Sequence, residues 1–181
     1  MSIDKVIESL PAMSADNREK LRSNAENLRD TGNQTQVSNA ERVLQALIDT
    51  AAEEKQARYD ELSAMSMAER VQDSFDSDPA TKNEQRVITG IIDHPGLTPS
   101  ALTSKCGLRS QSWRAYFAAM LKRREVVFWP DTPTNPIDID GLMGLLIDVD
   151  EAESTLTMKP EMEATFRKLG FGTKKRRMAA S

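Results

Sequence analysis

Apolar side chains recur at three- and four-residue steps along most of the chain, a period that is typical of amphipathic helices. We expect a short first helix over residues 3–10, closed by Pro11. A second helix is capped by Ser14 and runs to about Asp30. Gly32 follows at a position that favours a left-handed C-cap. The pattern therefore predicts helices from the start of the chain onwards.

Three segments carry Ser or Thr followed by Glu three residues later, the signature of a helix capping box: residues 38–41, 66–69 and 81–84. The first predicts the start of a long amphipathic helix, which either packs on its own neighbours or serves as a dimerisation helix. The second predicts a short helix through Phe75. The third predicts a helix that ends at residues 94–96, His-Pro-Gly.

Residues 97–129 carry the clearest helix boundaries in the chain. Thr98 is a favoured cap, Pro99 suits the first helical position, and Gly107 is expected to end this helix, with Leu102 and Cys106 facing inward. After a tight turn at residues 108–110, a second helix is expected. Its apolar stripe should pack on the preceding helices and consists of Trp113, Phe117, Met120 and Leu121. Two helices joined by a tight turn are thus predicted.

The opposite face of that second helix is small and polar. Its alanines allow a close approach to a groove, and Gln111 and Arg114 near the helix start are placed to reach base edges. Three cations at the other end are suited to neutralising phosphates. A merely solvated basic face has the same pattern. The candidate DNA-contacting residues are Arg109, Ser110, Gln111, Ser112, Arg114, Ala115, Ala118, Lys122, Arg123 and Arg124.

Over residues 81–169 this pattern resembles the winged-helix branch of the helix-turn-helix superfamily, of a MarR-like kind. The resemblance implies three helices, with residues 112–124 as the recognition helix, and a strand at 126–129 that leads into a wing. It also implies a returning strand at 154–160 and a final helix at 161–169. DNA is the partner that such a domain is expected to bind.

The segment between those two strands differs from a DNA-contacting wing. Residues 130–153 hold seven Asp and Glu and no Lys or Arg, so phosphates would repel them. Either the wing folds away from DNA, or the domain uses its fold to bind protein. An apolar run at 142–149 is an extra strand or a partner site, and its length favours the strand.

Net charge varies sharply along the chain, although the whole carries only −4. Residues 1–81 hold 9 Lys and Arg against 16 Asp and Glu, whereas residues 82–129 hold 8 against 3. Because charge acts on partners through local fields, the middle segment is expected to form a basic working surface. The acidic stretch 73–79 marks a candidate domain boundary. The basic run Lys174, Lys175, Arg176 and Arg177 either adds non-specific nucleic-acid affinity or only solubilises the tail.

Side chains for catalysis or metal binding are sparse. Asp138, Asp140 and Gly141 lack the spacing of a calcium loop, so no metal is expected. His94 and Cys106 lack the third group and oxyanion site that nucleophilic catalysis needs. The glycines form no phosphate-binding loop. We therefore expect neither an enzyme nor a cofactor.

Taken together, the sequence predicts a mainly α protein with an acidic helical region at 1–76, a winged helix-turn-helix domain with a small β wing at 77–170, and a basic tail at 171–181. The expected function is DNA binding, with transcription regulation as its purpose and double-stranded DNA as partner. A homodimer through the N-terminal helices is expected. The alternative is a non-enzymatic protein-interaction module. No membrane-spanning run is present, and a single cysteine suits a cytoplasmic, or in bacteria nucleoid-associated, protein.

Overall fold

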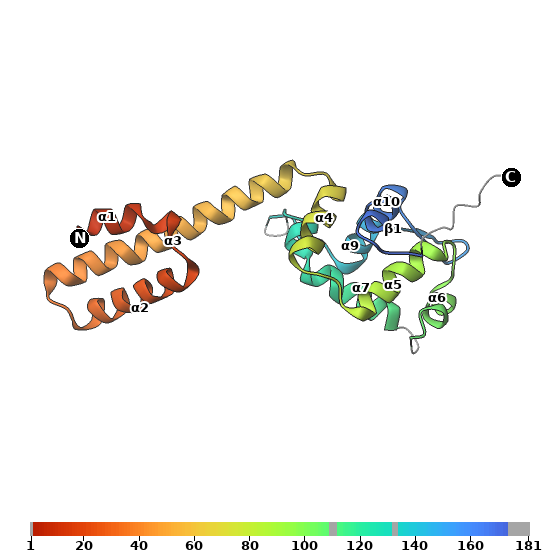
Figure 1. The fold of residues 1–181 in the computed structure, drawn as a ribbon, viewed down its shortest axis with the longest axis horizontal. Helices are drawn as coiled ribbons and strands as arrows, with labels where there is room; N and C mark the ends of the chain where they lie inside the picture. Colours follow the sequence, from red (N-terminus) through yellow and green to blue (C-terminus); the bar gives the residue numbers. More distant parts are fainter. Residues whose placement is uncertain (1, 109–111, 132–133, 174–181) are drawn as a thin grey trace. The chain divides into compact units, whose positions relative to one another are not determined.

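A computed structural model describes residues 2–108, 112–131 and 134–173, and for Ser112 the backbone only (Figure 1). These residues are mainly helical, with one two-stranded antiparallel sheet, as expected. The chain divides into an N-terminal unit, residues 1–61, and a C-terminal unit, residues 62–181. Within the described part, no helix is long and apolar enough to cross a membrane.

The boundary between the units differs from the one that the sequence predicted. We expected it after Asp76, within an acidic stretch, whereas it lies between Glu61 and Leu62. Helix α4 (Met67–Ser77) belongs to the C-terminal unit because it buries Val71 and Phe75 in that unit's core.

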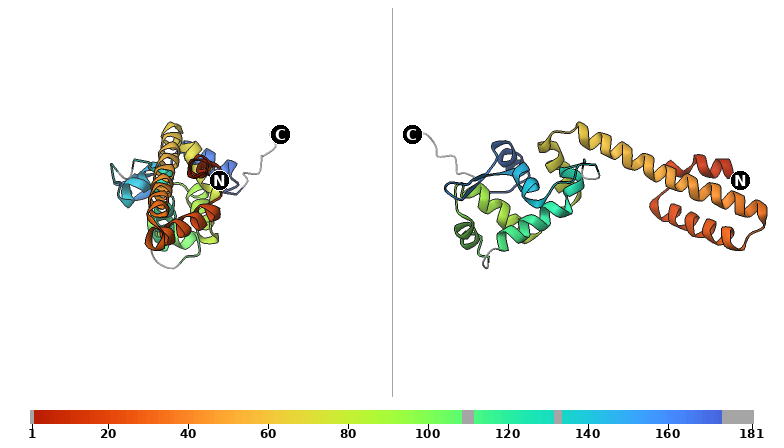
Figure 2. Two further views of the ribbon diagram at one scale, coloured as in Figure 1. Left: turned by 90° about the vertical axis from the view of Figure 1, so that its left-hand side faces the viewer. Right: turned by 180° about the vertical axis from the view of Figure 1, so that it is seen from behind.

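The N-terminal unit consists of helices around one long helix. Its elements are α1 (Ile3–Glu8), the 3-10 helix η1 (Leu10–Ala12), α2 (Ala15–Thr31) and α3 (Gln34–Ala64), whose last residues belong to the C-terminal unit. Helix α3 lies between α1 and α2 (Figures 1 and 2). The core between them is small and consists of Leu10, Ala25, Ala40, Val43 and Leu47.

A guanidinium joins three of these elements. Arg18 on α2 donates to the carbonyl oxygens of Leu10 at 2.9 Å and Pro11 at 3.1 Å, and it pairs with Glu54 on α3 at 2.7 Å. The hydrogen bond from Arg18 lowers the pKa of the Glu54 carboxyl. The pair is solvent-exposed, so it orients the helices more than it stabilises them.

Helix α3 begins earlier than expected. Ser38, predicted as its cap, lies inside the helix. One turn before it, the side chain of Asn33 accepts from the Gln36 amide at 3.1 Å, and Gln36 Oε1 accepts from the Asn33 amide at 2.9 Å. This reciprocal pair performs the role that we assigned to Ser38 and Glu41.

Gly32 ends α2, as predicted, but not in a left-handed conformation. Its φ of −78° and ψ of 166° are extended values open to any residue. A Cβ at this position would lie 2.4 Å from the Leu28 carbonyl oxygen. Close backbone approach, rather than positive φ, therefore calls for glycine here.

The C-terminal unit holds seven helices and two strands among its described residues. After α4 they are α5 (Lys82–Asp93), α6 (Pro99–Lys105), α7 (Ser112–Arg123), α8 (Glu125–Phe128), α9 (Ile139–Leu146), β1 (Ile147–Asp150), β2 (Thr155–Met158) and α10 (Pro160–Lys168). The capping boxes of Ser66 with Glu69 and of Thr81 with Glu84 are both confirmed.

One apolar core joins these elements. The predicted stripe of α7 is buried in it, with Phe117, Met120 and Leu121 fully covered. Around Phe166 three rings meet edge to face, because Phe75, Phe166 and Phe171 lie with centroids 5.3–5.6 Å apart. Such contacts between rings add to the burial of apolar area. The core thus links α4 and α10 to the helices of the middle segment.

The sheet is a hairpin with a short third partner. Strand β1 pairs with β2 from Ile147 opposite Met158 to Asp150 opposite Thr155. Leu97, in the connection between α5 and α6, forms an isolated antiparallel bridge with Leu156 on β2. The returning strand and the helix after it are thus confirmed.

The prediction of a strand at residues 126–129 is wrong. Residues 126–129, rich in β-favouring side chains, form the short helix α8 and its end, because Glu125 and Phe128, three residues apart, are both buried. The apolar run at 142–149 was expected to be a strand and is largely α9, which Asp138 caps by accepting from the Gly141 amide at 2.7 Å. Only the last residues of the run, 147–149, belong to β1.

Gly90 sets how closely α5 and α6 approach. A Cβ there would lie 2.4 Å from Cys106 Sγ and 3.2 Å from Leu102 Cδ1. We predict that Gly90→Ala lowers the free energy of unfolding by about 1–3 kcal/mol, measured by urea denaturation. Adding Cys106→Ala should recover part of that loss, since it removes the clashing sulfur.

Gly144→Ala is the matched control, because no heavy atom lies within 4 Å of the added Cβ and the residue is in the interior of α9. It should stabilise the protein by about 0.5–1 kcal/mol. Equal effects of the two substitutions would contradict the close approach at Gly90.

Candidate nucleic-acid interface

Helices α6 and α7 are the two helices that the sequence predicted within residues 97–124. Thr98 Oγ1 accepts from the Ala101 amide at 3.4 Å and Pro99 occupies the first helical position. Gly107 follows the end of α6 with φ of +63°, a left-handed conformation that favours glycine. Three of the candidate residues, Arg109, Ser110 and Gln111, lie outside the described residues.

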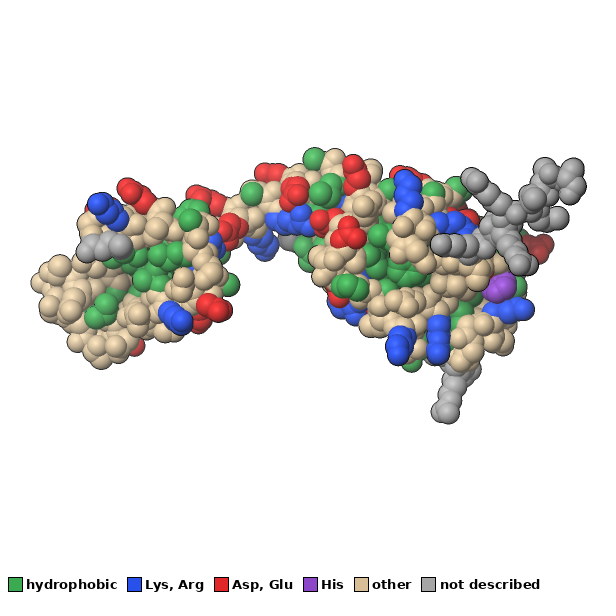
Figure 3. Space-filling model, viewed as in Figure 1, with side chains coloured by type: hydrophobic (Ala, Val, Ile, Leu, Met, Phe, Trp, Pro, Cys, Tyr) green, Lys and Arg blue, Asp and Glu red, His purple; other side chains and the backbone are tan. Residues whose placement is uncertain are grey.

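The outer face of α7 carries the described candidates. The side chains of Arg114 and Lys122 are 50% and 68% exposed, Ala115 is exposed and Ala118 is half-buried. Arg114, Ala115 and Ala118 line an open hollow together with Trp113 and Pro99, the first residue of α6. Figure 3 shows Lys and Arg side chains over the region of α5, α6 and α7. The chain thus brings small residues and two cations to one accessible helix face.

Both cations on this face already have a carboxylate partner. Arg114 forms a short ion pair with Asp140 on α9, and Lys122 Nζ lies 2.5 Å from a carboxylate oxygen of Glu125. Because Asp140 is 67% exposed and exposed ion pairs contribute about 0–1 kcal/mol, a phosphate can replace it at small cost. The Glu125 carboxylate is only 11% exposed, so Lys122 gives up a stronger interaction when it binds a phosphate instead. The pairs reduce the positive field over α7 without closing the face.

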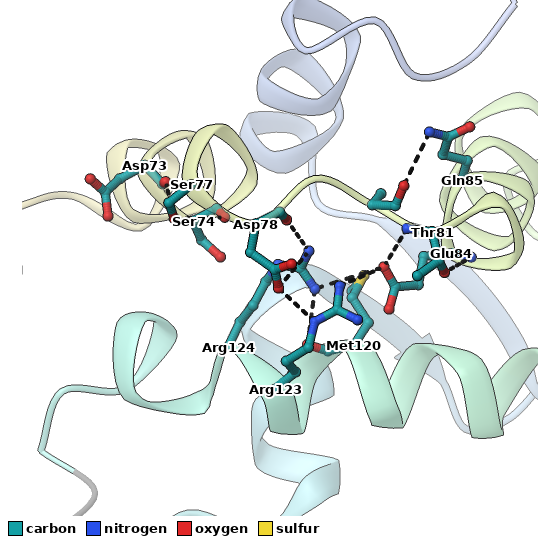
Figure 4. A network of polar contacts seen from close by, with 11 residues as sticks. Asp73, Ser74, Ser77, Asp78, Thr81, Glu84, Gln85, Met120, Arg123 and Arg124 are labelled. Carbon is teal, nitrogen blue, oxygen red and sulfur yellow. Dashed lines mark hydrogen bonds and ion pairs between the residues drawn. The ribbon is translucent and has the colours of Figure 1, made fainter. Parts of the chain in front are cut away.

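Arg124 is not part of this surface, which corrects the prediction that it contacts phosphates. The side chain is only 2% exposed, and its guanidinium lies 4.2 Å from the centre of the Phe75 ring. It donates to the carbonyl oxygen of Asp78 and pairs with the carboxylates of Asp78 and Glu84 at 3.3 and 3.8 Å (Figure 4). Burial lowers the pKa of this guanidinium. The residue therefore holds α7 to the α4–α5 connection.

Arg123 shares the same carboxylates but from the solvent side. Its side chain is 40% exposed and bonds Asp78 at 2.5 Å and Glu84 at 3.1 Å (Figure 4). Two of its donors are thus engaged within the protein. Arg123 is a weaker phosphate candidate than Arg114 or Lys122.

The β1–β2 hairpin is acidic, as the sequence indicated. Asp148 and Asp150 on β1 and Glu151 and Glu153 in the turn are exposed. Asp150 Oδ1 accepts from the amides of Ala152 and Glu153 and so shapes the turn. A hairpin of this charge does not favour contact with phosphates.

Three exposed cations that the sequence analysis did not single out lie on neighbouring helices. They are Lys82 and Arg86 on α5 and Lys105 at the end of α6. The signal in the sequence was the four-residue spacing of Lys82 and Arg86, which places both on one helix face. The basic run Lys174, Lys175, Arg176 and Arg177 lies outside the described residues.

Among the described residues, no group of three or more His, Cys, Asp or Glu side chains is placed to hold a metal ion. Cys106 is half-buried, and burial raises the pKa of its thiol, which donates weakly to the Arg86 carbonyl oxygen at 3.5 Å. A thiol in this state is a poor nucleophile at neutral pH.

A scan against protein-family models and searches of curated proteins and of solved structures find no match to the chain.

Arg124 is buried whereas Arg123 is partly exposed, and this difference can be tested directly. We predict that Arg124→Met lowers the free energy of unfolding by about 3 kcal/mol, because it leaves the Glu84 carboxylate buried with only Arg123 to compensate. Arg123→Met, the same substitution one residue earlier, should cost about 1 kcal/mol or less. Urea denaturation followed by circular dichroism measures both, and similar costs would contradict a buried role for Arg124.

Proposed function

We propose that the chain binds double-stranded DNA through the exposed face of α7 and serves as a transcription regulator. The observation that carries this proposal is an accessible face of α7, the second helix of the proposed helix-turn-helix. It is formed by Arg114, Ala115, Ala118 and Lys122. Small side chains permit close approach to the major groove, and the cations supply phosphate or guanine contacts.

The order of elements supports a winged-helix domain around this face. Helices α5, α6 and α7 are followed by a hairpin, and Leu97 between the first two helices pairs with β2. A winged helix has the same order of three helices and returning strands. Here the segment with α8 and α9 is inserted between the proposed recognition helix and the hairpin. The insertion supplies Asp140, the partner of Arg114.

The N-terminal unit is the proposed dimerisation element. A single recognition helix offers few contacts, and paired half-sites one helical turn apart double them. On α3, Ile48 is exposed by 60%, a position that a second copy would cover.

The acidic hairpin favours one second candidate, a protein partner. Val149 on β1 is 55% exposed between Asp148 and Asp150. Exposed apolar and acidic side chains on one hairpin suit a partner surface that combines apolar and basic groups. In this alternative the domain is a protein-interaction module.

The DNA proposal is tested with fluorescence anisotropy on a random-sequence duplex over a range of salt concentrations. Binding should weaken steeply as salt rises, because phosphate contacts release counterions. The double variant Arg114→Ala/Lys122→Ala should reduce the log–log slope by about 2. Lys20→Ala/Lys168→Ala removes the same charge from α2 and α10 and should leave the slope unchanged. Absence of binding by the unaltered protein at low salt would overturn the proposal.

Asp140 gives a test in the opposite direction. Asp140→Asn frees Arg114 from its ion pair, so we predict that duplex affinity rises about two- to fivefold, the equivalent of one exposed pair. Asp76→Asn on α4 is the matched control, since Asp76 is exposed and the net charge change is identical. Equal gains from both variants would show that total charge, and not release of Arg114, sets the affinity.

A further inference from the structure

The exposed side of α5 carries cations that have no carboxylate partner among the described residues. Lys82, Arg86, Thr89 and Asp93 follow one another at steps of four, three and four, so they lie on one stripe, the α5 stripe. Lys82 and Arg86 are exposed, whereas Val87 and Ile91 on the opposite side are buried.

Lys105 adds a third charge beside this stripe. The next residue, Cys106, donates its thiol to the carbonyl oxygen of Arg86 at 3.5 Å, so the end of α6 lies against the middle of α5. Lys105 is exposed and also lacks an ion pair among the described residues. Three unpaired cations thus occupy adjoining parts of two helices.

The chain after α10 is attached to the other end of the same stripe. The Gly172 amide donates to Thr89 Oγ1 at 3.3 Å, and the amide and hydroxyl of Thr173 donate to the Asp93 carboxylate at 2.9 and 2.7 Å. In the sequence, Thr173 is followed directly by the basic run 174–177. The last described residues are therefore held at the Asp93 end of the stripe, beyond Arg86.

This surface and the outer face of α7 lie on different sides of the packed helices α5 and α7. Helix α7 packs Phe117 and Met120 into the core that also holds Val87, Ile88 and Ile91 of α5. Arg114 and Lys122 are on the side of α7 away from that core, and Lys82 and Arg86 are on the side of α5 away from it. One straight duplex cannot lie against both faces.

We propose that Lys82, Arg86 and Lys105 form a second phosphate-binding surface for the backbone of double-stranded DNA, so that one chain holds two duplex segments. The inference rests on the proposed function of α7 and adds a second contact to it. These cations give up no ion pair when they meet a phosphate, in contrast to Arg114 and Lys122. Their surface offers charge without base-reading geometry, so it binds any sequence.

Two measurements on the full chain test this surface. In anisotropy with a random-sequence duplex, Lys82→Ala/Arg86→Ala/Lys105→Ala should reduce the log–log salt slope by about 2–3 when the second surface is saturated. In a bridging assay, a duplex fixed on beads should retain a labelled free duplex only when unaltered protein is added. The triple variant and Arg114→Ala/Lys122→Ala should each abolish this retention while keeping binding to a single duplex.

The control removes three exposed cations elsewhere, Lys20→Ala/Lys55→Ala/Lys168→Ala, and should bridge like the unaltered protein. Thermal melting verifies that each variant folds. If the triple variant still bridges, two α7 faces in an oligomer suffice and the inference is overturned while the proposed function stands. If the unaltered protein binds no duplex at low salt, the proposed function fails first.

Discussion

The buried guanidinium of Arg124 is the interaction on which the C-terminal unit depends. It lies at the end of α7 and meets the Asp78 backbone and carboxylate, the Glu84 carboxylate and the Phe75 ring. The end of α4, the start of α5 and the end of α7 therefore converge on one charge. Removing that charge from water is costly, and only several partners together offset the cost. Its position fixes the end of α7, and so the direction in which the outer face of that helix points.

Glu84 shows how local and tertiary constraints combine at this point. Its carboxylate closes the capping box by accepting from the Thr81 amide at 2.9 Å, and it also pairs with Arg123 and Arg124. The start of α5 and the end of α7 are thus held by the same carboxylate oxygen, Glu84 Oε2. The capping box was evident in the sequence, because it needs only residues three apart. Its link to α7 was not, because nothing local predicts a partner 39 or 40 positions away.

The same distinction separates what the sequence predicted from what it did not. Caps at Ser66, Thr81 and Thr98 and the end of α6 at Gly107 follow from short-range chemistry and were predicted. Residues 126–129 were expected to be a strand because of the resemblance to winged helices, whereas burial of Phe128 accompanies a helix, α8, at this place. Arg124 was assigned to phosphates because a sequence shows charge but not burial. The group formed by Lys82, Arg86 and Lys105 was overlooked because Lys105, on α6, lies about twenty residues further along the chain than the two cations on α5.

The two groups of cations differ in what they can contribute to DNA binding under the proposed function. An unpaired cation such as Lys82 gains by meeting any phosphate, so it supplies affinity without discrimination. Arg114 gains only where DNA offers a better partner than Asp140, for example a guanine edge that accepts two hydrogen bonds. Contacts that merely equal the carboxylate change nothing. The ion pair on α7 therefore penalises non-specific contact more than specific contact, and it makes an acidic insertion beside a recognition helix compatible with sequence selectivity.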